Sequence, residues 1–386
     1  MSVNVRAIAA GILTATSLFG MAYTAFAMVR LRAFEKRERD ARMAGSPSIT
    51  ILKPLHGDEP QLYEHLRSFC DQRYEQFDIV FGAADANDPA LPVARRLQHE
   101  FPDVPIRIVA GSPGKARNPK VANLLGMEPF VTGDLIVIAD SDIRVHENYL
   151  ALLAAPFEDD AVGAATCIFS GLPNETPASR IGAMAITDEF SPSVLVAATL
   201  APVDFCVGAT VAVRAPVFRE FGGFASIADC LADDYEIGQQ VVRSGHKIVL
   251  APFAVQTAVP ERRLRDIWHH EVRWARTVFR ARPAGYAGTI VMHYPVLLLA
   301  AAVLNGFSML SIALFAAGAA LRTFNHTEAH RILAPRQRAS SHLLPVRIVL
   351  SLGVWCAAFS GRRVGWRGTE YAVDAEGRLV GNPGDL

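Results

Sequence analysis

Two aspartates stand where an apolar run of the sequence ends. Asp140 and Asp142 directly follow Leu-Ile-Val-Ile-Ala at positions 135–139, a run typical of a buried parallel strand. Carboxylates at alternate positions supply the oxygen ligands that Mg²⁺ or Mn²⁺ prefers, and such a cation can bridge a diphosphate. A solvated turn is the alternative explanation for so short a motif.

A second acidic pair, Asp233 and Asp234, precedes a helical stretch that ends near Ser244. An acidic side chain at the start of a helix can cap it and interacts favourably with the positive end of the helix dipole. This structural role is enough to explain one of the two aspartates. The functional alternative makes one of them a general base in a site shared with the metal.

The segment 261–276 is rich in arginine and contains Trp268 and Trp274. Arginine side chains directed at lipid phosphates and tryptophans at the membrane interface are typical of an amphipathic surface helix. His269 and His270 are adjacent to each other, and adjacent residues on a helix do not face the same way, so we do not expect them to bind a metal.

The elements that position these residues alternate between strands and helices. This order predicts a doubly wound α/β sheet, whose ligands bind at the carboxyl ends of the strands. Lys53 ends the first strand, and Asp85 follows the second. A dinucleotide-type G-x-G-x-x-G does not follow the first strand. The expected strands are 48–53, 77–84, 106–110 and 134–139, and the expected helices are 61–71, 89–100 and 119–125.

Composition limits the class of protein. The 386 residues include 38 Lys plus Arg and 38 Asp plus Glu, and this balance argues against a nucleic-acid partner. Apolar residues make up 51% and charged residues 20%, which favours a water-soluble domain with membrane segments attached. The five cysteines show neither a zinc spacing nor a disulfide framework.

The apolar excess lies largely at the two ends of the chain. Residues 7–29 carry no charge and are followed by several arginines, which predicts an uncleaved anchor with the next domain in the cytoplasm. A cleaved signal peptide is the alternative, but the run is long and its charges follow it.

The C-terminal apolar region leaves the number of membrane passes in the chain, the N-terminal anchor included, open between two and four. Residues 283–321 carry no charged side chain and could form one tilted helix or two passes turning at Asn305-Gly306. Residues 343–360 are a weaker candidate because Arg347 interrupts them. Residues 184–213, which include Asp188 and Glu189, could be domain core or a lipid-facing re-entrant stretch.

Together these residues resemble the inverting membrane glycosyltransferases of the GT-A fold. The resemblance is closest to the ceramide glucosyltransferase family, whose subgroup includes bacterial hopanoid-biosynthesis-associated glycosyltransferases, and it covers nearly the whole chain. The motifs that carry it are Asp85 in Asp-Ala-Asn-Asp-Pro, Asp140 in Asp-Ser-Asp, Asp234 in Leu-Ala-Asp-Asp-Tyr, Arg273-Trp274, and Asn118-Pro-Lys120. His270 departs from the pattern, which has Gln or Arg at that position.

The resemblance implies transfer of glucose or N-acetylglucosamine from a UDP-sugar to a hydroxyl of a membrane lipid, either ceramide or a hopanoid. Asp234 would be the general base, and Asp140 and Asp142 would hold Mg²⁺ or Mn²⁺. The donor would be bound by Asp85 at the uridine half, by Lys53 and Lys120 as cationic partners, and by Arg273 at the diphosphate, with Trp274 at the acceptor mouth.

The same resemblance implies a domain organisation and a location. We expect an anchor at 1–30, a cytoplasmic GT-A domain at 45–282 that ends in the amphipathic helix, membrane segments at 283–361 and a basic tail at 362–386. We expect the protein in a bacterial inner membrane. The competing functions are a catalytically silent nucleotide-sugar-binding or scaffold protein, and a processive polysaccharide synthase, which needs more passes to form a channel.

Overall fold

The computed structural model describes residues 3–43, 47–360, 363–366, 369–374 and 377–380. The chain divides into two compact units, and each combines segments that are distant in sequence. The sheet unit comprises Arg37–Phe169, Ala198–Pro260 and Arg362–Leu386. The helical unit comprises Met1–Lys36, Ser170–Ala197 and Glu261–Gly361.

Within the described residues, the sheet unit contains an eight-stranded sheet in the order β3-β2-β1-β4-β7-β6-β8-β5. Strands β1 to β4 are parallel, and β7 pairs antiparallel with both β4 and β6. The strands are β1 (Ile49–Leu55), β2 (Phe77–Ala83), β3 (Ile106–Ala110), β4 (Leu135–Ile138), β5 (Ile143–Arg144), β6 (Val162–Pro173), β7 (Val211–Arg214) and β8 (Lys247–Val259).

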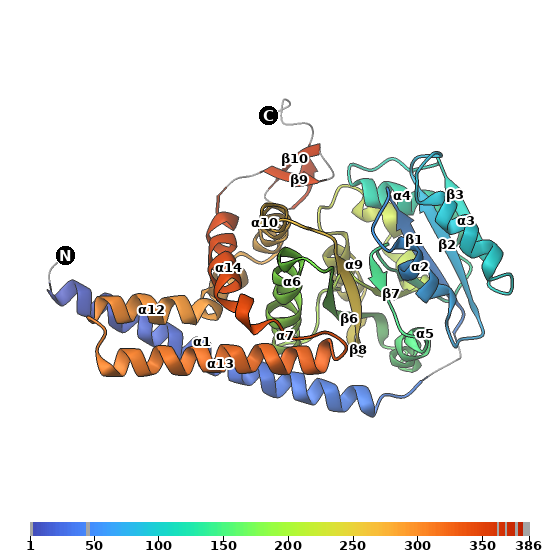
Figure 1. Ribbon diagram of the computed structural model, residues 1–386. Coiled ribbons are helices and arrows are strands. Elements are labelled where there is room, and N and C mark those ends of the chain that lie inside the picture. Colours follow the sequence, from blue (N-terminus) through green and yellow to red (C-terminus); the bar gives the residue numbers. More distant parts are fainter. Residues whose placement is uncertain (1–2, 44–46, 361–362, 367–368, 375–376, 381–386) are drawn as a thin grey trace. The chain divides into compact units, whose positions relative to one another are not determined.

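Short helices connect these strands (Figure 1). Helix α3 packs on β3, and α4 packs on β1 and β2. The helices are α2 (Leu62–Cys70), α3 (Leu91–Glu100), α4 (Pro119–Met127), α5 (Tyr149–Ala154), α8 (Ala215–Glu220) and α9 (Asp233–Arg243), with 3₁₀ turns η1 (Glu128–Phe130), η2 (Ala155–Glu158) and η4 (Gly223–Ile227).

The predicted alternation of strands and helices is confirmed in the parallel half of the sheet. The chain moves outward from β1 through β2 to β3 and then returns to place β4 on the other side of β1. This reversal is a topological switch point, and ligands bind outside the carboxyl ends of the strands there. The core beneath it includes Leu52 and Val80 of the strands and Val121 and Leu124 of α4, all fully buried.

The helical unit is built from apolar helices. Its elements are α1 (Val3–Arg39), α6 (Pro177–Met184), the π-helical turn η3 (Ala185–Phe190), α7 (Ser191–Leu200), α10 (Leu264–Ala281), α11 (Pro283–Gly288), η5 (Thr289–His293), α12 (Tyr294–Leu304), α13 (Met309–Leu333), η6 (Ser341–Leu343) and α14 (Leu344–Ala358). Figure 1 shows α1, α12 and α13 side by side, and an ion pair of 2.9 Å joins Arg32 of α1 to Glu328 of α13.

Four helical segments among the described residues are long and apolar enough to cross a membrane: Val5–Arg39, Pro177–Leu200, Pro283–Leu304 and Ser341–Ala358. The first is the expected anchor segment. The long apolar stretch after residue 282 turns at Asn305-Gly306, one of the two arrangements left open, and Gly306 has a φ of +61° there. The second segment overlaps residues 184–213, which the sequence led us to expect as domain core or as a lipid-facing re-entrant stretch.

Arg347 shows how an apolar helix accommodates a charge. Its side chain is 2% exposed and forms an ion pair of 2.6 Å with Glu271, and its second pair, with Glu189, measures 3.4 Å. A charge buried in apolar surroundings requires such partners. The arginine that weakened the prediction of a helical segment at 343–360 is therefore paired with carboxylates inside the helical unit.

The C-terminal tail, which was expected to be basic, contains as many acidic as basic residues. Its described residues form a second small sheet in the sheet unit. It contains β9 (Arg363–Trp366), β10 (Thr369–Val373) and β11 (Leu379–Val380) in the order β11-β10-β9. The amide of Leu379 donates to Asp229 O at 2.7 Å, and the amide of Leu231 donates to Gly377 O at 3.1 Å. The tail thus attaches to the loop that leads into α9.

Candidate active site

Lys120 links two acidic residues that are far apart in the sequence. Its Nζ lies 2.8 Å from Asp140 Oδ1 and 2.9 Å from Asp233 Oδ2. Burial disfavours the charged ammonium, but the charges of Asp140 and Asp233 outweigh this and raise the pKa of Lys120. Lys120 is therefore a permanent cation between the end of β4 and the start of α9.

Asn118 positions Lys120. Its side chain caps α4 by accepting from the amides of Lys120 and Val121 at 2.9 and 3.2 Å. The same side chain donates to Cys230 O at 2.8 Å. The Asn-Pro-Lys segment thus opens one helix and holds the loop that leads into the next.

Asp142 is held by a residue of β8. Thr257 Oγ1 donates to Asp142 Oδ2 at 2.8 Å, and the amide of Ala258 donates to Asp142 O at 3.0 Å. Burial and the neighbouring charge of Asp140 raise the pKa of Asp142. Asp140 and Asp142 therefore repel each other, and a cation between them would offset the repulsion.

Asp234 lies in the first turn of α9, next to Asp233. Burial, followed by the charge of Asp233, raises the pKa of Asp234, while Lys120 lowers it. Gly208 leaves room for the carboxylate, because a Cβ at that position would lie 3.1 Å from Asp234 Oδ2. A carboxyl group with a raised pKa is suited to accept a proton near neutral pH.

Lys53 lies inside strand β1 and contacts the backbone of Asp140. Its side chain is fully buried, its Nζ donates to Asp140 O, and it sits 3.8 Å from the centre of the Phe69 ring. Burial lowers the pKa of Lys53 to about 7. Lys53 therefore holds the backbone at Asp140 and is shielded from solvent.

Asp85 follows β2 at the surface. Its side chain is exposed, and Oδ1 accepts from the amide of Asn87 at 2.9 Å. The neighbouring Asp88 is 5% exposed and accepts from the amide of Gly57 at 3.0 Å. Asp88 thus joins the loops that follow β1 and β2, and it leaves Asp85 available to a ligand.

Arg273 and Trp274 lie on α10 in the helical unit, whereas the carboxylates described above lie in the sheet unit. His270, one turn before Trp274, is bonded to Glu261, and its ring lies 4.5 Å from the Trp274 ring. The role of Arg273 and Trp274 beside the carboxylates stays a prediction.

Comparison with known proteins identifies the family. The profile of Glycosyl transferase family 21 matches residues 12–379. The chain belongs to this family. Curated relatives are ceramide glucosyltransferase 3 of Caenorhabditis elegans, 22% identical over 236 residues, and the ceramide glucosyltransferase of Komagataella phaffii, 32% identical over 125 residues.

The matched regions are shorter than the relatives. They cover 58% and 31% of this chain, and 48% and 25% of the nematode and yeast proteins, so the chain spans at most about half the length of these relatives. Among solved structures, a mannosyltransferase from Pyrobaculum calidifontis covers 90% of this chain and 97% of its own, with 19% identity and a TM-score of 0.53. This likeness supports the expected GT-A type of fold.

Sequence reasoning missed several residues of the site in this family 21 protein. Asp233 was treated as an alternative to Asp234, but the structure pairs it with Lys120. Thr257 and Gly208 carry no motif, and their contacts with Asp142 and Asp234 depend on how the antiparallel half of the sheet folds. The Asn-Pro-Lys segment was a usable signal, because Asn before Pro at a helix start is typical of a cap.

The residues at the end of β4 fit a divalent cation by their chemistry. Asp140 and Asp142 offer carboxylate oxygens, which suit Mg²⁺ and Mn²⁺ and not softer ions. Lys120 already contacts Asp140 Oδ1, so one positive charge is present beside the pair without a metal.

Proposed function

We propose that this family 21 protein transfers a sugar from a UDP-sugar to a hydroxyl of a membrane lipid, with inversion at the anomeric carbon. The observation that carries the proposal is the position of Asp234. Its carboxyl group, with a raised pKa, lies at the start of α9, and its neighbour Asp233 shares Lys120 with Asp140 at the switch point of the sheet.

The proposed reaction is a single displacement. The acceptor oxygen forms a bond to the anomeric carbon while the bond from that carbon to the β-phosphate oxygen breaks. The acceptor proton passes to the Asp234 carboxylate, and the bonding electron pair leaves with UDP. Because one base acts and no carboxylate of the protein attacks the sugar, the configuration inverts.

Negative charge develops on the departing diphosphate and requires cationic partners. Lys120 supplies a fixed positive charge, and Lys53 secures the backbone that carries Asp140. A Mg²⁺ or Mn²⁺ ion held by Asp140 and Asp142 would neutralise further charge on the leaving group. The Pyrobaculum mannosyltransferase structure contains GDP-mannose and Mn²⁺, which agrees with a nucleotide-sugar donor and a divalent metal here.

The family membership supports the proposed donor and acceptor. Asp85, exposed after β2, would contact the uridine half. Arg273 would contact the diphosphate, and Trp274 would pack at the acceptor mouth, as the family motif implies. The names of the relatives favour glucose and ceramide, while N-acetylglucosamine and a hopanoid polyol remain the second pair. The four apolar helical segments would hold the enzyme at the membrane where it meets its lipid.

The decisive experiment pairs two donors with two acceptors. Purified protein in lipid nanodiscs is incubated with labelled UDP-glucose or UDP-N-acetylglucosamine and with ceramide or a hopanoid polyol, and the product mass is measured. We expect metal-dependent glycolipid from one pair, and NMR of its anomeric proton should show the inverted configuration. Absence of UDP release with every lipid would favour the silent binding protein.

The base assignment is tested separately with Asp234→Asn. We expect turnover to fall by about 10²–10⁴-fold, the usual contribution of a general base, while UDP still binds. Asp160→Asn, in the same unit but with a fully exposed side chain, is the matched control and should keep full turnover. Near-normal turnover in Asp234→Asn would remove the assignment.

A further inference from the structure

Three side chains of metal-binding type converge inside the helical unit. Asp188 lies in the π-helical turn η3, and His326 and His330 lie one turn apart on α13, where a spacing of four residues places both rings on one face. His326 Nδ1 is 2.7 Å from Asp188 Oδ2, and His330 Nε2 is 3.6 Å from Asp188 Oδ1. One ligand atom of each residue lies within 4.8 Å of the other two.

These side chains are buried and incompletely paired. Asp188, His326 and His330 are 2%, 0% and 7% exposed. In the part of the chain that the structure describes, no hydrogen bond reaches Asp188 Oδ1, His326 Nε2 or either ring nitrogen of His330. Buried polar atoms are normally hydrogen-bonded, so four such atoms in one cluster need an explanation. The contact between His326 Nδ1 and Asp188 Oδ2 does not satisfy these four atoms, because it involves neither Asp188 Oδ1 nor His326 Nε2.

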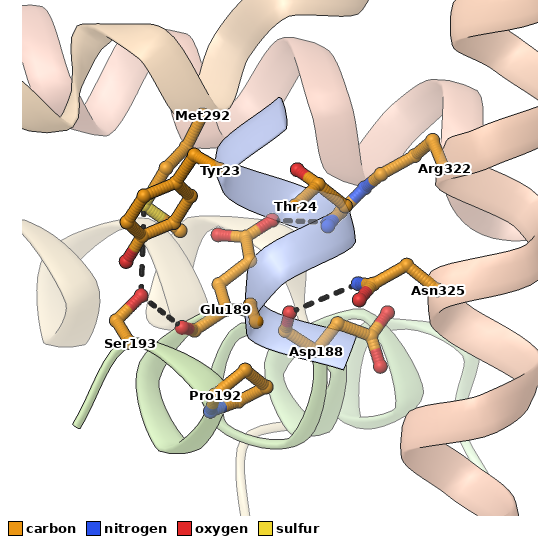
Figure 2. Close-up of a pocket in the computed structure, with 10 residues that line it drawn as sticks. Tyr23, Thr24, Asp188, Glu189, Pro192, Ser193, Met292, Arg322 and Asn325 are labelled. Carbon is orange, nitrogen blue, oxygen red and sulfur yellow. Dashed lines mark hydrogen bonds and ion pairs between the residues drawn. The ribbon is translucent and has the colours of Figure 1, made fainter. Parts of the chain in front are cut away.

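The neighbouring charges leave the cluster negative. Arg322 pairs with Glu189 at 2.6 Å, and Arg347 pairs with Glu271 at 2.6 Å, so these two arginines balance the two glutamates. Asp188 then carries one negative charge that these pairs do not offset. Figure 2 shows its backbone oxygen accepting from Asn325, at 3.3 Å, beside the Arg322–Glu189 pair.

We propose that Asp188, His326 and His330 bind one transition-metal ion of the zinc type. Two imidazoles and one carboxylate are a typical ligand set for such an ion, which would use the free nitrogen lone pairs and offset the charge of Asp188. The oxygen ligands Asp140 and Asp142 in the sheet unit suit a different class of metal. The ion would fasten α13 to η3 through these three ligands.

The test measures zinc in the full-length protein. Wild type and variants are purified in detergent through a tag that contains no histidine, stripped with a chelator, and incubated with limiting zinc in millimolar Mg²⁺, which occupies the carboxylate site. Zinc per chain is then counted by mass spectrometry after gel filtration. The variants are His326→Gln and His330→Gln, and the matched control is His342→Gln, an exposed histidine of the same unit.

We expect about one zinc per chain in wild type and in His342→Gln. In His326→Gln and His330→Gln we expect zinc affinity to be at least ~10-fold weaker, because even residues that only orient a ligand change affinity by ~10–100-fold. Zinc should also raise the melting temperature of the stripped wild type and leave that of the two ligand variants unchanged.

Equal zinc in wild type and both ligand variants would overturn the proposal. So would a wild type that retains no zinc, because a proton shared by Asp188 and His326 would then supply the missing charge. If the variants do not fold, X-ray absorption spectroscopy of zinc bound to the wild type identifies the ligand atoms and tests the proposal. Two imidazole ligands support the site, and a shell of oxygen alone rejects it.

Discussion

At the scale of single residues, the site contains two lysines whose pKa values are shifted in opposite directions. Lys120 keeps its charge because Asp140 and Asp233 flank it, whereas burial lowers the pKa of Lys53 to about 7. The pKa of Asp234 is raised by burial and by Asp233. Their different surroundings thus make Lys120 a permanent cation, give Lys53 a pKa of about 7, and suit Asp234 to accept a proton.

Asp233→Asn should shift the pH dependence of turnover. As the proposed base, Asp234 must be deprotonated to act, so we expect its raised pKa to set the acidic limb of the kcat profile. Removing the negative charge of Asp233 lowers the pKa of Asp234, and the limb moves to lower pH. The measurement is kcat against pH for wild type and variant. An unchanged limb, or one moved to higher pH, would contradict the base assignment.

Lys53→Met should alter how stability depends on pH. Because the pKa of Lys53 is lowered in the folded protein, the unfolded chain binds more protons between about pH 7 and the ordinary lysine pKa near ~10.4. The free energy of unfolding of the wild type therefore rises with pH across this window. We expect a smaller rise of the melting temperature between pH 7 and 9 in Lys53→Met, together with reduced turnover because Asp140 loses a backbone contact.

At the scale of elements, the start of α4 and the tail strand β11 both bond to the loop that leads into α9. Asn118 at the start of α4 holds Cys230 O, and the tail strand β11 bonds to the same loop through Leu379 and Asp229. Leu379 is fully buried against Leu231 and Val373. The position of Asp234 therefore depends on a sheet made from the last part of the chain.

Leu379→Ala should loosen this attachment. Loss of a buried leucine side chain costs about 2–5 kcal/mol, which is large for so small a sheet. We expect faster proteolysis of the tail and lower kcat, with UDP binding largely kept. Val380→Ala, at a half-buried neighbouring position, is the control and should change neither. Full activity in a Leu379→Ala protein whose tail has been cleaved would contradict the role of the tail.

The parallel half of the sheet could be predicted from the sequence because its signals are local. Each strand from β1 to β4 is an apolar run bounded by turn or capping residues, and the positions of Asp140 and Asp142 follow from the rule that ligands bind at strand ends. Lys53 was expected at the end of the first strand, but β1 continues to Leu55 and the Lys53 side chain is fully buried. The antiparallel half could not be predicted in this way, since the pairing of β7 with β4 and β6 joins residues distant in sequence. The contacts of Thr257 and Asp233 depend on that half.

At the scale of the whole molecule, most residues of the proposed reaction and the apolar helices belong to separate units, with Arg273 and Trp274 of the helical unit as the exceptions. The proposed base and the carboxylates for the donor lie in the sheet unit, while all four candidate membrane segments lie mainly in the helical unit. The neutral net charge of the chain is an average over both. Perturbation of one unit should therefore be measurable apart from the other.

Two glycines of α1 test this separation. A Cβ at Gly20 would lie 2.0 Å from Val291 O, whereas no atom of the described chain lies within 4 Å of a Cβ at Gly11. Gly20→Ala should destabilise the helical unit by about 1–3 kcal/mol through overpacking. Gly11→Ala should be neutral or stabilising by up to ~1 kcal/mol through helix propensity. Thermal melting reports the difference, and UDP binding should be the same in both; weakened UDP binding in Gly20→Ala would contradict the separation.

The interleaving of the two units has a consequence for biosynthesis. The sheet unit receives its first strands early in translation, but its last segment, residues 362–386, follows the final apolar helix α14. Domains generally fold as units during synthesis, from the N-terminus onward. A nascent chain cannot add the strand that supports the α9 loop until the four candidate membrane segments have been synthesised, so this loop gains its support from β11 only after them.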